Sequence, residues 1–290
     1  DDKRDTLETV DLEPPESDDS LLKILGVLAT SSRWNELADR TAQAATSTTN
    51  LTAIVTNSEA NALLRALCLV VRDFLADRVY FVGPLRLEPR SHYEALPQGI
   101  GRDVGKAGQF TAALISQLGD SKVVSPRMDG HHKNETLNEA LNYWLGPEGL
   151  NLVAKVEATP QGELGYGLRV QPIGLEQMVH LNAVGMGVSQ ILPVIVQGLI
   201  APHINTVIIL QQPELHLHPA LQQGLGDFLL ALSMSGRQVI LETHSNHIAE
   251  RLARRVAEND SARRYIDLKL VDRTSEEGTT YQTAPIDQYG

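Results

Sequence analysis

The sequence has little cysteine, no excess of positive charge and no long apolar run, and each absence excludes a class of protein. Cys68 is the single cysteine of the 290 residues, so an internal disulfide framework is excluded. No apolar stretch reaches the ~18 residues that indicate a membrane span. The first residues carry neither the apolar stretch nor the cleavage site of a signal peptide. A reducing, cytoplasmic setting without membrane contact is therefore expected.

The balance of charge argues against a protein built around nucleic acid. Twenty-five Lys and Arg stand against thirty-six Asp and Glu, which gives a net charge of −11 and no global basic field. The densest basic group consists of five arginines near the end of the chain: Arg251, Arg254, Arg255, Arg263 and Arg264. Because Glu250 and Glu258 are interspersed, we interpret this group as a solvated helix face. Binding of DNA or RNA is the alternative, which the net charge does not support.

Composition divides the chain into three parts. Residues 1–20 are predicted to be an acidic linker or disordered segment, since the first nineteen hold nine acidic and two basic residues. Residues 21–78 place Ala and Leu at spacings of three and four, which predicts a helical arm or insertion. Residues 79–290 are predicted to form an α/β region. Arg86 and Arg90 follow its first strand, where they could contact either a nucleotide or a partner protein.

The pattern within residues 79–290 predicts helices and two kinds of sheet. Helical spacing is present at 110–118 and 137–145, and short apolar runs over 152–181 indicate an antiparallel meander. A short apolar strand is predicted at 79–82. Beyond Gly187, helices alternate with two buried strands at 207–210 and 239–241, as in a parallel sheet. Pro193 is expected near the end of the first turn of its helix, where proline is best tolerated.

The first of three polar segments in the last third is a glycine pair that opens a helix. Gly185 and Gly187 allow a backbone to approach an anion closely, and the amides at a helix N-terminus favour a phosphate. Ser189 adds a hydroxyl donor and Gln190 follows it. A glycine pair that simply caps a core helix is the alternative interpretation.

The other two segments follow the predicted strands at 207–210 and 239–241. Gln211, Gln212 and Glu214 lie at the carboxyl end of the first strand, which is the edge where α/β sheets bind ligands. Pro219 then opens a helix at its first position. His216 and His218 could suggest zinc, but no third and fourth ligands occur at metal spacing. His244 ends the next strand, and Ser245 or Asn246 is expected to cap the helix that follows.

In this order and spacing, the three segments resemble the tail of the ABC-type ATPases, in particular the RecF, SMC and OLD-like branch. The matching pieces there are a signature loop, a strand followed by a Pro-Glu-x-His-Leu-His-Pro turn, and a Thr-His-Ser switch. The stretch from Tyr80 to Arg86 is also similar to this branch, so the resemblance covers residues 79–290. It implies an α/β fold of the P-loop NTPase class, present here as a partial domain with a parallel sheet, a helical arm and an antiparallel meander.

The resemblance also implies an ATPase that uses ATP and Mg²⁺ and dimerises around the nucleotide. Gly185, Gly187, Ser189 and Gln190 are then the nucleotide-binding residues, and Gln212, Glu214 and His244 are the catalytic group, with His244 at the γ-phosphate. Glu214 either orients the attacking water or stabilises its turn. Gln211 takes the Mg²⁺ position, where the family has an acid. An amide there, natural or introduced, implies slow hydrolysis that Glu at this position would raise.

The sequence contains no G-x-x-x-x-G-K-[ST] motif, the P-loop that wraps the phosphates. Residues 101–107 come nearest, but they have one residue too few between the glycines and Ala107 in place of the hydroxyl, so we interpret them as a structural loop. A role in antiphage defence or DNA maintenance, with a nuclease as effector, follows from the resemblance alone. The alternative is a nucleotide-sensing scaffold with little hydrolysis that restrains a nuclease or toxin. No group of acids and lysine fits a nuclease in the chain itself.

Overall fold

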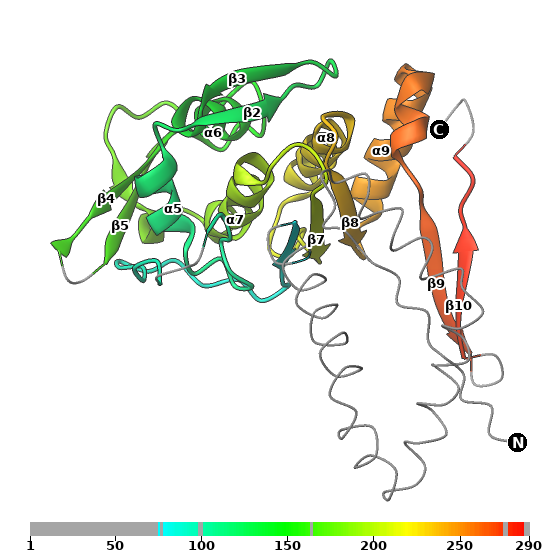
Figure 1. The fold of residues 1–290 in the computed structure, drawn as a ribbon, viewed down its shortest axis with the longest axis horizontal. Helices are drawn as coiled ribbons and strands as arrows, with labels where there is room; N and C mark the ends of the chain where they lie inside the picture. Colours follow the sequence, from blue (N-terminus) through cyan, green and yellow to red (C-terminus); the bar gives the residue numbers. More distant parts are fainter. Residues whose placement is uncertain (1–74, 76–77, 98–100, 163–164, 275–277, 287–290) are drawn as a thin grey trace, which may run out of the picture. The chain divides into compact units, whose positions relative to one another are not determined.

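A computed structural model describes residues 75, 78–97, 101–162, 165–274 and 278–286 (Figure 1). These residues lie within the unit Arg72–Gly290. The acidic segment 1–20 lies outside the described residues, and so does the helical arm 21–78 apart from Leu75 and Arg78, so both boundaries remain predictions. None of the described helices is both long and apolar enough to cross a membrane.

A three-stranded parallel sheet carries the strand ends that the sequence singled out. Its strands are β1 (Val79–Val82), β7 (Val207–Gln211) and β8 (Gln238–Glu242), in the order β1-β7-β8. The three predicted strands are therefore confirmed, with β7 and β8 one or two residues longer than expected. Because all three strands run parallel, their carboxyl ends meet at one edge of the sheet.

The prediction that the last strand is buried is wrong for one of its faces. Val239 and Leu241 pack against the core, whereas Ile240 is 48% exposed. Within the described ranges β8 pairs with β7 alone, so it forms an edge of the sheet. The face that carries Ile240 also carries Phe81 and Ile209, which are only partly buried. Parallel sheets usually have both faces covered, so this face is open to a further layer.

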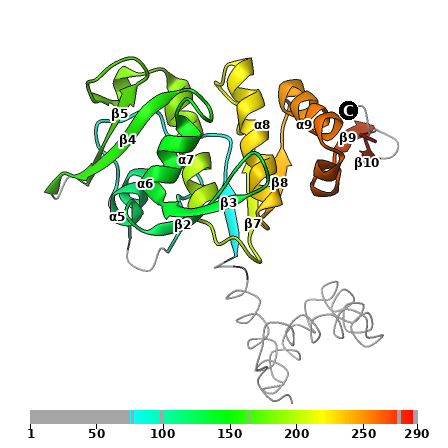
Figure 2. The ribbon, with the colours of Figure 1, turned by 90° about the horizontal axis from the view of Figure 1, so that it is seen from above.

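Helix α7 (Met186–Ile200) lies between the parallel sheet and an antiparallel sheet formed by residues 153–180, as both Figure 1 and Figure 2 show. Every residue from Val188 to Ile200 is buried. The prediction that Pro193 lies near the end of the first turn is wrong. The helix begins at Met186, so the proline is its eighth residue. The proline ring packs against Gly108, where a Cβ would lie 2.5 Å from the ring Cγ.

Helices α8 (Pro219–Met234) and α9 (Asn246–Glu258) follow β7 and β8 and begin as predicted. Pro219 is the first residue of α8, and the side chain of His218 caps that helix by accepting from the amide of Ala220. The hydroxyl of Ser245 caps α9 by accepting from the amide of Ile248. Both caps lie close to the strand ends, so they fix the direction in which the chain leaves the edge of the sheet.

The predicted meander is confirmed as a sheet of three antiparallel strands: β4 (Val153–Pro160), β5 (Tyr166–Pro172) and β6 (Val179–His180). Helices α5 (Thr111–Leu118) and α6 (Leu137–Leu145) contact β4, and both agree with the predicted spacing. Short 3-10 helices occupy η2 (Leu181–Ala183) and η3 (Asp260–Tyr265).

Two antiparallel hairpins were not predicted. One pairs β2 (Lys122–Pro126) with β3 (His132–Thr136), and the other pairs β9 (Lys269–Thr274) with β10 (Gly278–Thr283). Their strands contain Lys, His, Asn, Asp and Thr, and they lack the apolar alternation by which a strand is recognised. The first hairpin is held to the core by the buried Arg237, which donates to the carbonyl oxygens of Val124 and Ala201.

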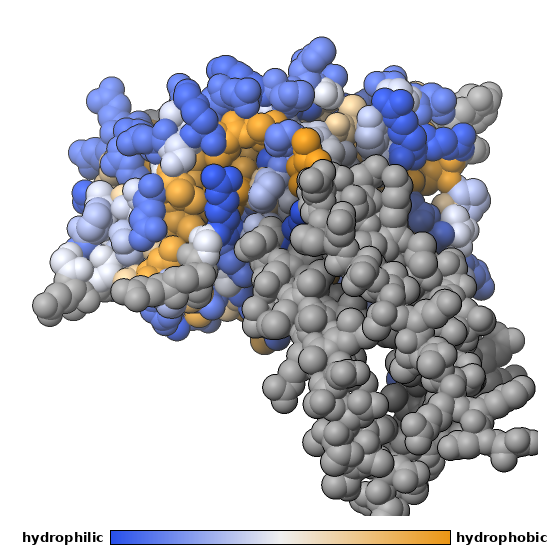
Figure 3. All heavy atoms as spheres, in the orientation of Figure 1, coloured by the Kyte–Doolittle hydropathy of each residue, from blue (hydrophilic) through white to orange (hydrophobic). Residues whose placement is uncertain are grey.

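One hydrophobic core joins the parallel and antiparallel parts. Trp144 of α6 packs edge-on against Phe228 of α8 with ring centroids 4.9 Å apart, and both are almost fully buried. The indole N–H of Trp144 donates to the carbonyl of Pro126, so this polar atom is satisfied inside the core. In the space-filling view, hydrophilic residues dominate the described surface, and apolar residues gather over the region of α5–α7 (Figure 3).

Candidate functional site

The chain leaves β7 through a tight turn in which two residues adopt left-handed backbone conformations. Gln212 has φ 43° and His216 has φ 63°. Positive φ is uncommon outside glycine and strains the backbone, so the surrounding contacts must hold these residues in place. The amide of Gln212 donates to the carbonyl of Glu242, and the amide of Leu217 donates to the carbonyl of Glu214. The turn is therefore fastened both to itself and to β8.

Glu214 connects this turn to the end of β8. It is 7% exposed, and its Oε1 accepts a 2.8 Å hydrogen bond from the backbone amide of His244. Its other oxygen, Oε2, is buried and has no hydrogen-bond partner. The carboxylate thus fixes the backbone at His244 and keeps one acceptor free, an arrangement compatible with both roles that the sequence left open for Glu214.

Arg86 holds the same turn from the opposite side. Its guanidinium is 6% exposed and donates to the carbonyl oxygens of Gly83, Gln212 and Pro213 at 3.2–3.3 Å. Burial lowers the pKa of Arg86 to about 10, while the nearby charge of Glu214 acts in the opposite direction. Arg86 therefore fastens the loop after β1 to the turn after β7. Arg86 thus positions the backbone of the protein itself. The sequence alone left open whether it contacts a nucleotide or a partner protein.

The predicted catalytic residues come together at one cavity. This cavity has a volume of about 310 Å³, at the lower end of the range for ligand pockets. Its walls come from the β7 turn, the first turns of α8, and the end of β8, and the lining residues are Gln212, Glu214, Leu215, His216, Leu217, Gln222, His244 and Ser245. The imidazole of His244 is exposed, and none of the described residues hydrogen-bonds it. Its ring is therefore free to contact a ligand.

Gln222 of α8 is a residue of this cavity that the sequence did not single out. Its amide nitrogen donates to the carbonyl of Leu217, and its amide oxygen accepts from the hydroxyl of Ser245 at 2.5 Å. Gln222 therefore links the β7 turn to the cap of α9. Its position after Pro219 resembles that of any polar residue on a helix, so no sequence pattern marks it as part of a site.

The N-terminus of α7 lies beside the wall of the cavity. A Cβ added to Gly187 would lie 3.7 Å from the carbonyl oxygen of His216 and 3.7 Å from Leu217. Gly185 is the N-cap of α7 and is exposed, and no side chain caps this helix. The first amides of α7 are consequently available to an anion.

The polar side chains of this helix end are directed to the backbone. The hydroxyl of Ser189 donates to the carbonyl of Met186 at 2.7 Å and is 5% exposed as a residue. The amide of Gln190, 2% exposed, donates to the carbonyl of Leu87. In this structure Gln190 fastens α7 to the loop after β1, and the hydroxyl of Ser189 is bonded within the first turn of α7.

Gln211 and Glu242 are partners at the ends of β7 and β8. They are paired in the register of the two strands, and the amide nitrogen of Gln211 donates to Oε2 of Glu242 at 2.8 Å. The resemblance implies the Mg²⁺ position for Gln211, but it does not single out Glu242. The signal that could have revealed it is the position of Glu242 in front of Thr243 and His244, at the end of a parallel strand.

Three backbone amides of the loop 101–107 donate to side chains of the protein: those of Val104, Gly105 and Ala107. The amide of Val104 donates to the side chain of Gln197, and that of Gly105 donates to Asp103. The amide nitrogen of Gln197 in turn donates to the carbonyl of Arg102. Gln197 is fully buried in α7. These bonds agree with the interpretation of this loop as structural, which stays a prediction.

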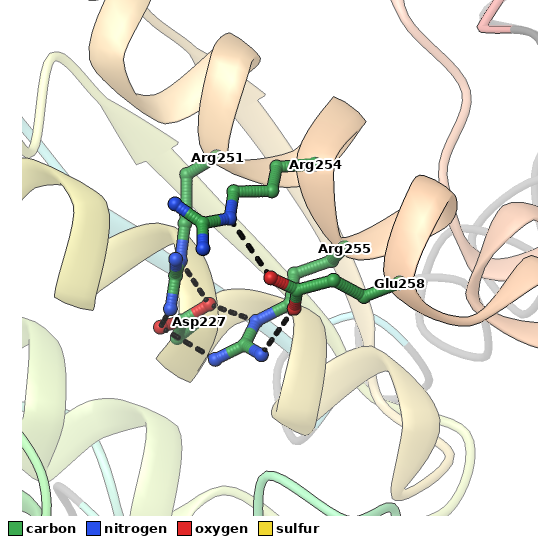
Figure 4. A network of polar contacts seen from close by, with 5 residues as sticks. All are labelled: Asp227, Arg251, Arg254, Arg255 and Glu258. Atoms are coloured by element: carbon green, nitrogen blue, oxygen red, sulfur yellow. Dashed lines mark hydrogen bonds and ion pairs between the residues drawn. The ribbon is translucent and has the colours of Figure 1, made fainter. Parts of the chain in front are cut away.

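The basic group on α9 is paired with acids (Figure 4). Asp227 of α8 accepts two hydrogen bonds from Arg251 and two from Arg255, at 2.7–3.1 Å. Arg254 and Arg255 also form ion pairs with Glu258 at 2.8 Å. The bonds to Asp227 hold the pKa of Arg255 above its usual value. Two of the five arginines, Arg251 and Arg255, therefore join α8 to α9 through Asp227, an acid that the sequence pattern did not link to them.

Among the described residues, no three His, Cys, Asp or Glu side chains gather as they do in a protein-only metal site. The histidines that could have suggested zinc have other positions. His218 caps α8 with its Nδ1, and His216 lies in the left-handed part of the β7 turn.

Part of the chain is similar to known ATPases. Residues 127–249 match the model of a family described as an AAA ATPase domain. No curated protein matches the chain. Two similar solved structures are an SMC ATPase described in terms of ATP-driven dimerisation and DNA-stimulated activation, and an Smc head domain from Pyrococcus furiosus bound to the C-terminal domain of ScpA.

The first structure is 14% identical, with a TM-score of 0.37, and the match covers 50% of this chain and 78% of that one. The second is 10% identical, with a TM-score of 0.36, and the match covers 51% of this chain and 33% of that one, so this chain spans about a third of its length. The family match contains all three polar segments, from Gly185 to Asn246. Residues 127–249 of this chain are thus similar to the AAA ATPase domain family, in agreement with the resemblance to ATPases that the three segments indicate.

Proposed function

We propose that this chain binds and hydrolyses ATP as one part of an ATPase domain, at the edge of the sheet where β7 and β8 end. One observation carries the proposal. Gln212, Glu214 and His244 come from two different strand ends and line a single cavity, beside the uncapped N-terminus of α7. Residues from separate segments converge in this way at the carboxyl edge of parallel sheets that bind nucleotides.

The glycines of α7 support contact with a ligand. Gly185 has φ −59°, and neither glycine has the positive φ that would require glycine. A Cβ on Gly185 would meet no atom within 4 Å, and one on Gly187 would make only ordinary contacts. Packing within the chain therefore explains neither glycine. Close approach of a phosphate to the helix amides does explain both, with the hydroxyl of Ser189 as a further donor.

The site is completed by a P-loop that these 290 residues do not contain. By resemblance, two protomers enclose ATP, and the α7 N-terminus of one faces the P-loop of the other. The outer edge of β8 has no strand partner within the described residues, so a further strand could pair with it. This open edge supports the proposal that a missing segment completes the sheet. The partly exposed face with Phe81, Ile209 and Ile240 supports a further covering layer in the same way.

Each residue of the cavity has a role in this proposal. His244 donates to the γ-phosphate from the end of β8. Glu214 holds the backbone of His244 with one oxygen and accepts from the attacking water with the other, while Gln212 orients that water. The oxygen atoms of Gln211 and Glu242 form a donor set of the kind Mg²⁺ prefers. Mg²⁺ bound there would neutralise charge on the phosphate oxygens.

A test compares His244→Ala with His132→Ala in the protein that includes its P-loop segment. His132 is an exposed residue of the β2–β3 hairpin, so its loss controls for removal of an imidazole. We expect His132→Ala to turn over ATP normally and His244→Ala to lose at least about tenfold in turnover, as removal of transition-state donors does elsewhere. Equal turnover in the two variants would refute the proposed site.

A second candidate function is a nucleotide-gated scaffold with little hydrolysis. The observation that favours it is the presence of amides at both Gln211 and Gln212, where P-loop enzymes need negative charge. Comparison of the native protein with Gln211→Glu separates the two candidates. Turnover in the native protein, or turnover that appears only with Glu, indicates an ATPase. Tight ATP binding without turnover in both proteins indicates the scaffold.

The wider role is proposed from the resemblance alone. An ATP-driven dimer of this kind would gate an effector such as a nuclease, in antiphage defence or DNA maintenance. The effector is identified by co-purification with the native protein in the presence of ATP, with His244→Ala as the control. A complex that forms equally with both proteins, with and without ATP, would exclude gating by nucleotide.

A further inference from the structure

The ends of β7 and β8 present an amide and a carboxylate side by side. Gln211 and Glu242 are paired in register, and the 2.8 Å hydrogen bond between them runs from the amide nitrogen of Gln211 to Oε2 of Glu242. Gln211 uses only its nitrogen in this bond. Its carbonyl oxygen and the carboxylate of Glu242 are therefore two oxygen donors carried by paired residues at the same edge of the sheet.

The charge of Glu242 is not neutralised by the described part of the chain. Glu242 is exposed, and none of the described lysines, arginines or histidines forms an ion pair with its carboxylate. By contrast, the buried acids Asp227 and Glu135 are each paired with arginine. A bare carboxylate at the ligand-binding edge of a parallel sheet is a natural partner for a cation.

We propose that Glu242 supplies the carboxylate that positions Mg²⁺ on bound ATP, so that the acid lost at Gln211 is replaced from the neighbouring strand. This inference rests on the proposed function. Neighbouring strands lie about 4.8 Å apart, a shift that a long Glu side chain can span. Mg²⁺ usually keeps several of its waters, so Glu242 can act directly or through one of them. Gln211 then contributes its carbonyl oxygen and orients Glu242.

If Glu242 supplies the carboxylate for Mg²⁺, the acid that the family has at the position of Gln211 is no longer needed there. An acid at both positions would place two carboxylates within hydrogen-bond distance, which is unfavourable unless a cation or a proton lies between them. One acid and one amide avoid this repulsion and still provide oxygen donors on two strands. The metal ligand and His244 also come from the same strand end, only two residues apart.

The test uses Mn²⁺ as the probe and the protein with its P-loop segment. ATP binding is first measured in EDTA, and Mn²⁺ binding to the ATP complex is then measured by electron paramagnetic resonance. We expect Glu242→Gln to bind ATP in EDTA as the native protein does and to bind Mn²⁺ at least about tenfold more weakly. Glu176→Gln, which removes one exposed charge on the β5–β6 connection, should bind Mn²⁺ normally.

The reciprocal variant decides whether the acid has moved between strands. Gln211→Glu combined with Glu242→Gln restores one carboxylate at the other strand end, so we expect Mn²⁺ affinity to return to within a few fold of native. A Glu242→Gln protein that binds ATP and keeps native Mn²⁺ affinity would overturn the inference, and so would a double variant that remains weak. Failure of the native protein to bind ATP at all would instead overturn the proposed function.

Discussion

The carboxylate of Glu214 accepts a hydrogen bond of 2.8 Å from the backbone amide of His244, thirty residues further along the chain. Glu214 belongs to the turn after β7, and His244 lies two residues beyond the end of β8. This hydrogen bond therefore joins the backbone at His244 to the turn that carries Gln212.

Loss of the Glu214 carboxylate should loosen the end of β8. Glu214→Ala leaves the amide of His244 without its acceptor, and a hydrogen bond to a charged group contributes about 1.5–3 kcal/mol. We expect faster hydrogen exchange in a peptide spanning residues 241–246, with less change in β4. Glu214→Gln keeps an acceptor oxygen and should retain most of the protection. Equal exchange in the native protein and Glu214→Ala would show that this bond does not hold the strand end.

Replacement of Arg86 should destabilise the β7 turn even when positive charge is kept. The guanidinium reaches three carbonyl oxygens at once, which the single ammonium of Lys cannot reproduce. We expect Arg86→Met to lower the free energy of unfolding by about 3 kcal/mol and Arg86→Lys to recover only part of it. Chemical denaturation measures both.

A double-mutant cycle then tests whether Arg86 acts together with Glu214. Arg86→Met, Glu214→Gln and their combination should show a coupling energy above about 0.5 kcal/mol, because the two buried charges influence each other. Strictly additive effects would mean that Arg86 supports the loop after β1 without acting on the cavity.

The arginines of α9 should prove structural. Asp227→Asn removes the charge that accepts four hydrogen bonds from Arg251 and Arg255, and we expect a loss of about 2–3 kcal/mol in the free energy of unfolding. Glu258→Gln, at an exposed ion pair, should have a much smaller effect. Thermal unfolding compares the two. A stable Asp227→Asn protein that gains affinity for DNA would instead support the nucleic-acid interpretation.

The sequence predicted the site well where residues signal their own local structure. Pro219 and Ser245 predict the starts of α8 and α9 because a helix start has strong local preferences. Those starts, with the apolar strands before them, place Gln212, Glu214 and His244 at one edge of a parallel sheet. The joint position of these residues at one cavity follows from sheet geometry, which the alternation of helices and strands reveals.

The remaining features depend on contacts that sequence spacing does not encode. Arg86 donates a hydrogen bond to the carbonyl of Gln212, which is 126 residues away in the chain. Sequence spacing therefore could not predict that Arg86 binds the backbone and not a ligand. Glu242 becomes a candidate metal ligand only because the strand register pairs it with Gln211, and the sequence does not encode this register in its spacing. The exposed face of β8 was missed because Ile240 is as apolar as a core residue, and apolarity does not reveal which layer covers it.

Gly187→Ala provides the most direct test of the central claim that the α7 N-terminus and the strand ends together handle ATP. Alanine fits here and favours the helix by up to about 1 kcal/mol, so thermal stability should be unchanged or raised. Gly198→Ala is the contrasting control, since its Cβ would lie 2.6 Å from Phe228 and should destabilise the protein.

The decisive quantity is ATP turnover by Gly187→Ala in the protein that includes its P-loop segment. The account predicts a stably folded variant whose ATP turnover falls at least about tenfold, because the added methyl group blocks close approach to the helix amides. Native turnover in that stable variant would contradict the account and would reduce the glycine pair to an ordinary start of a core helix.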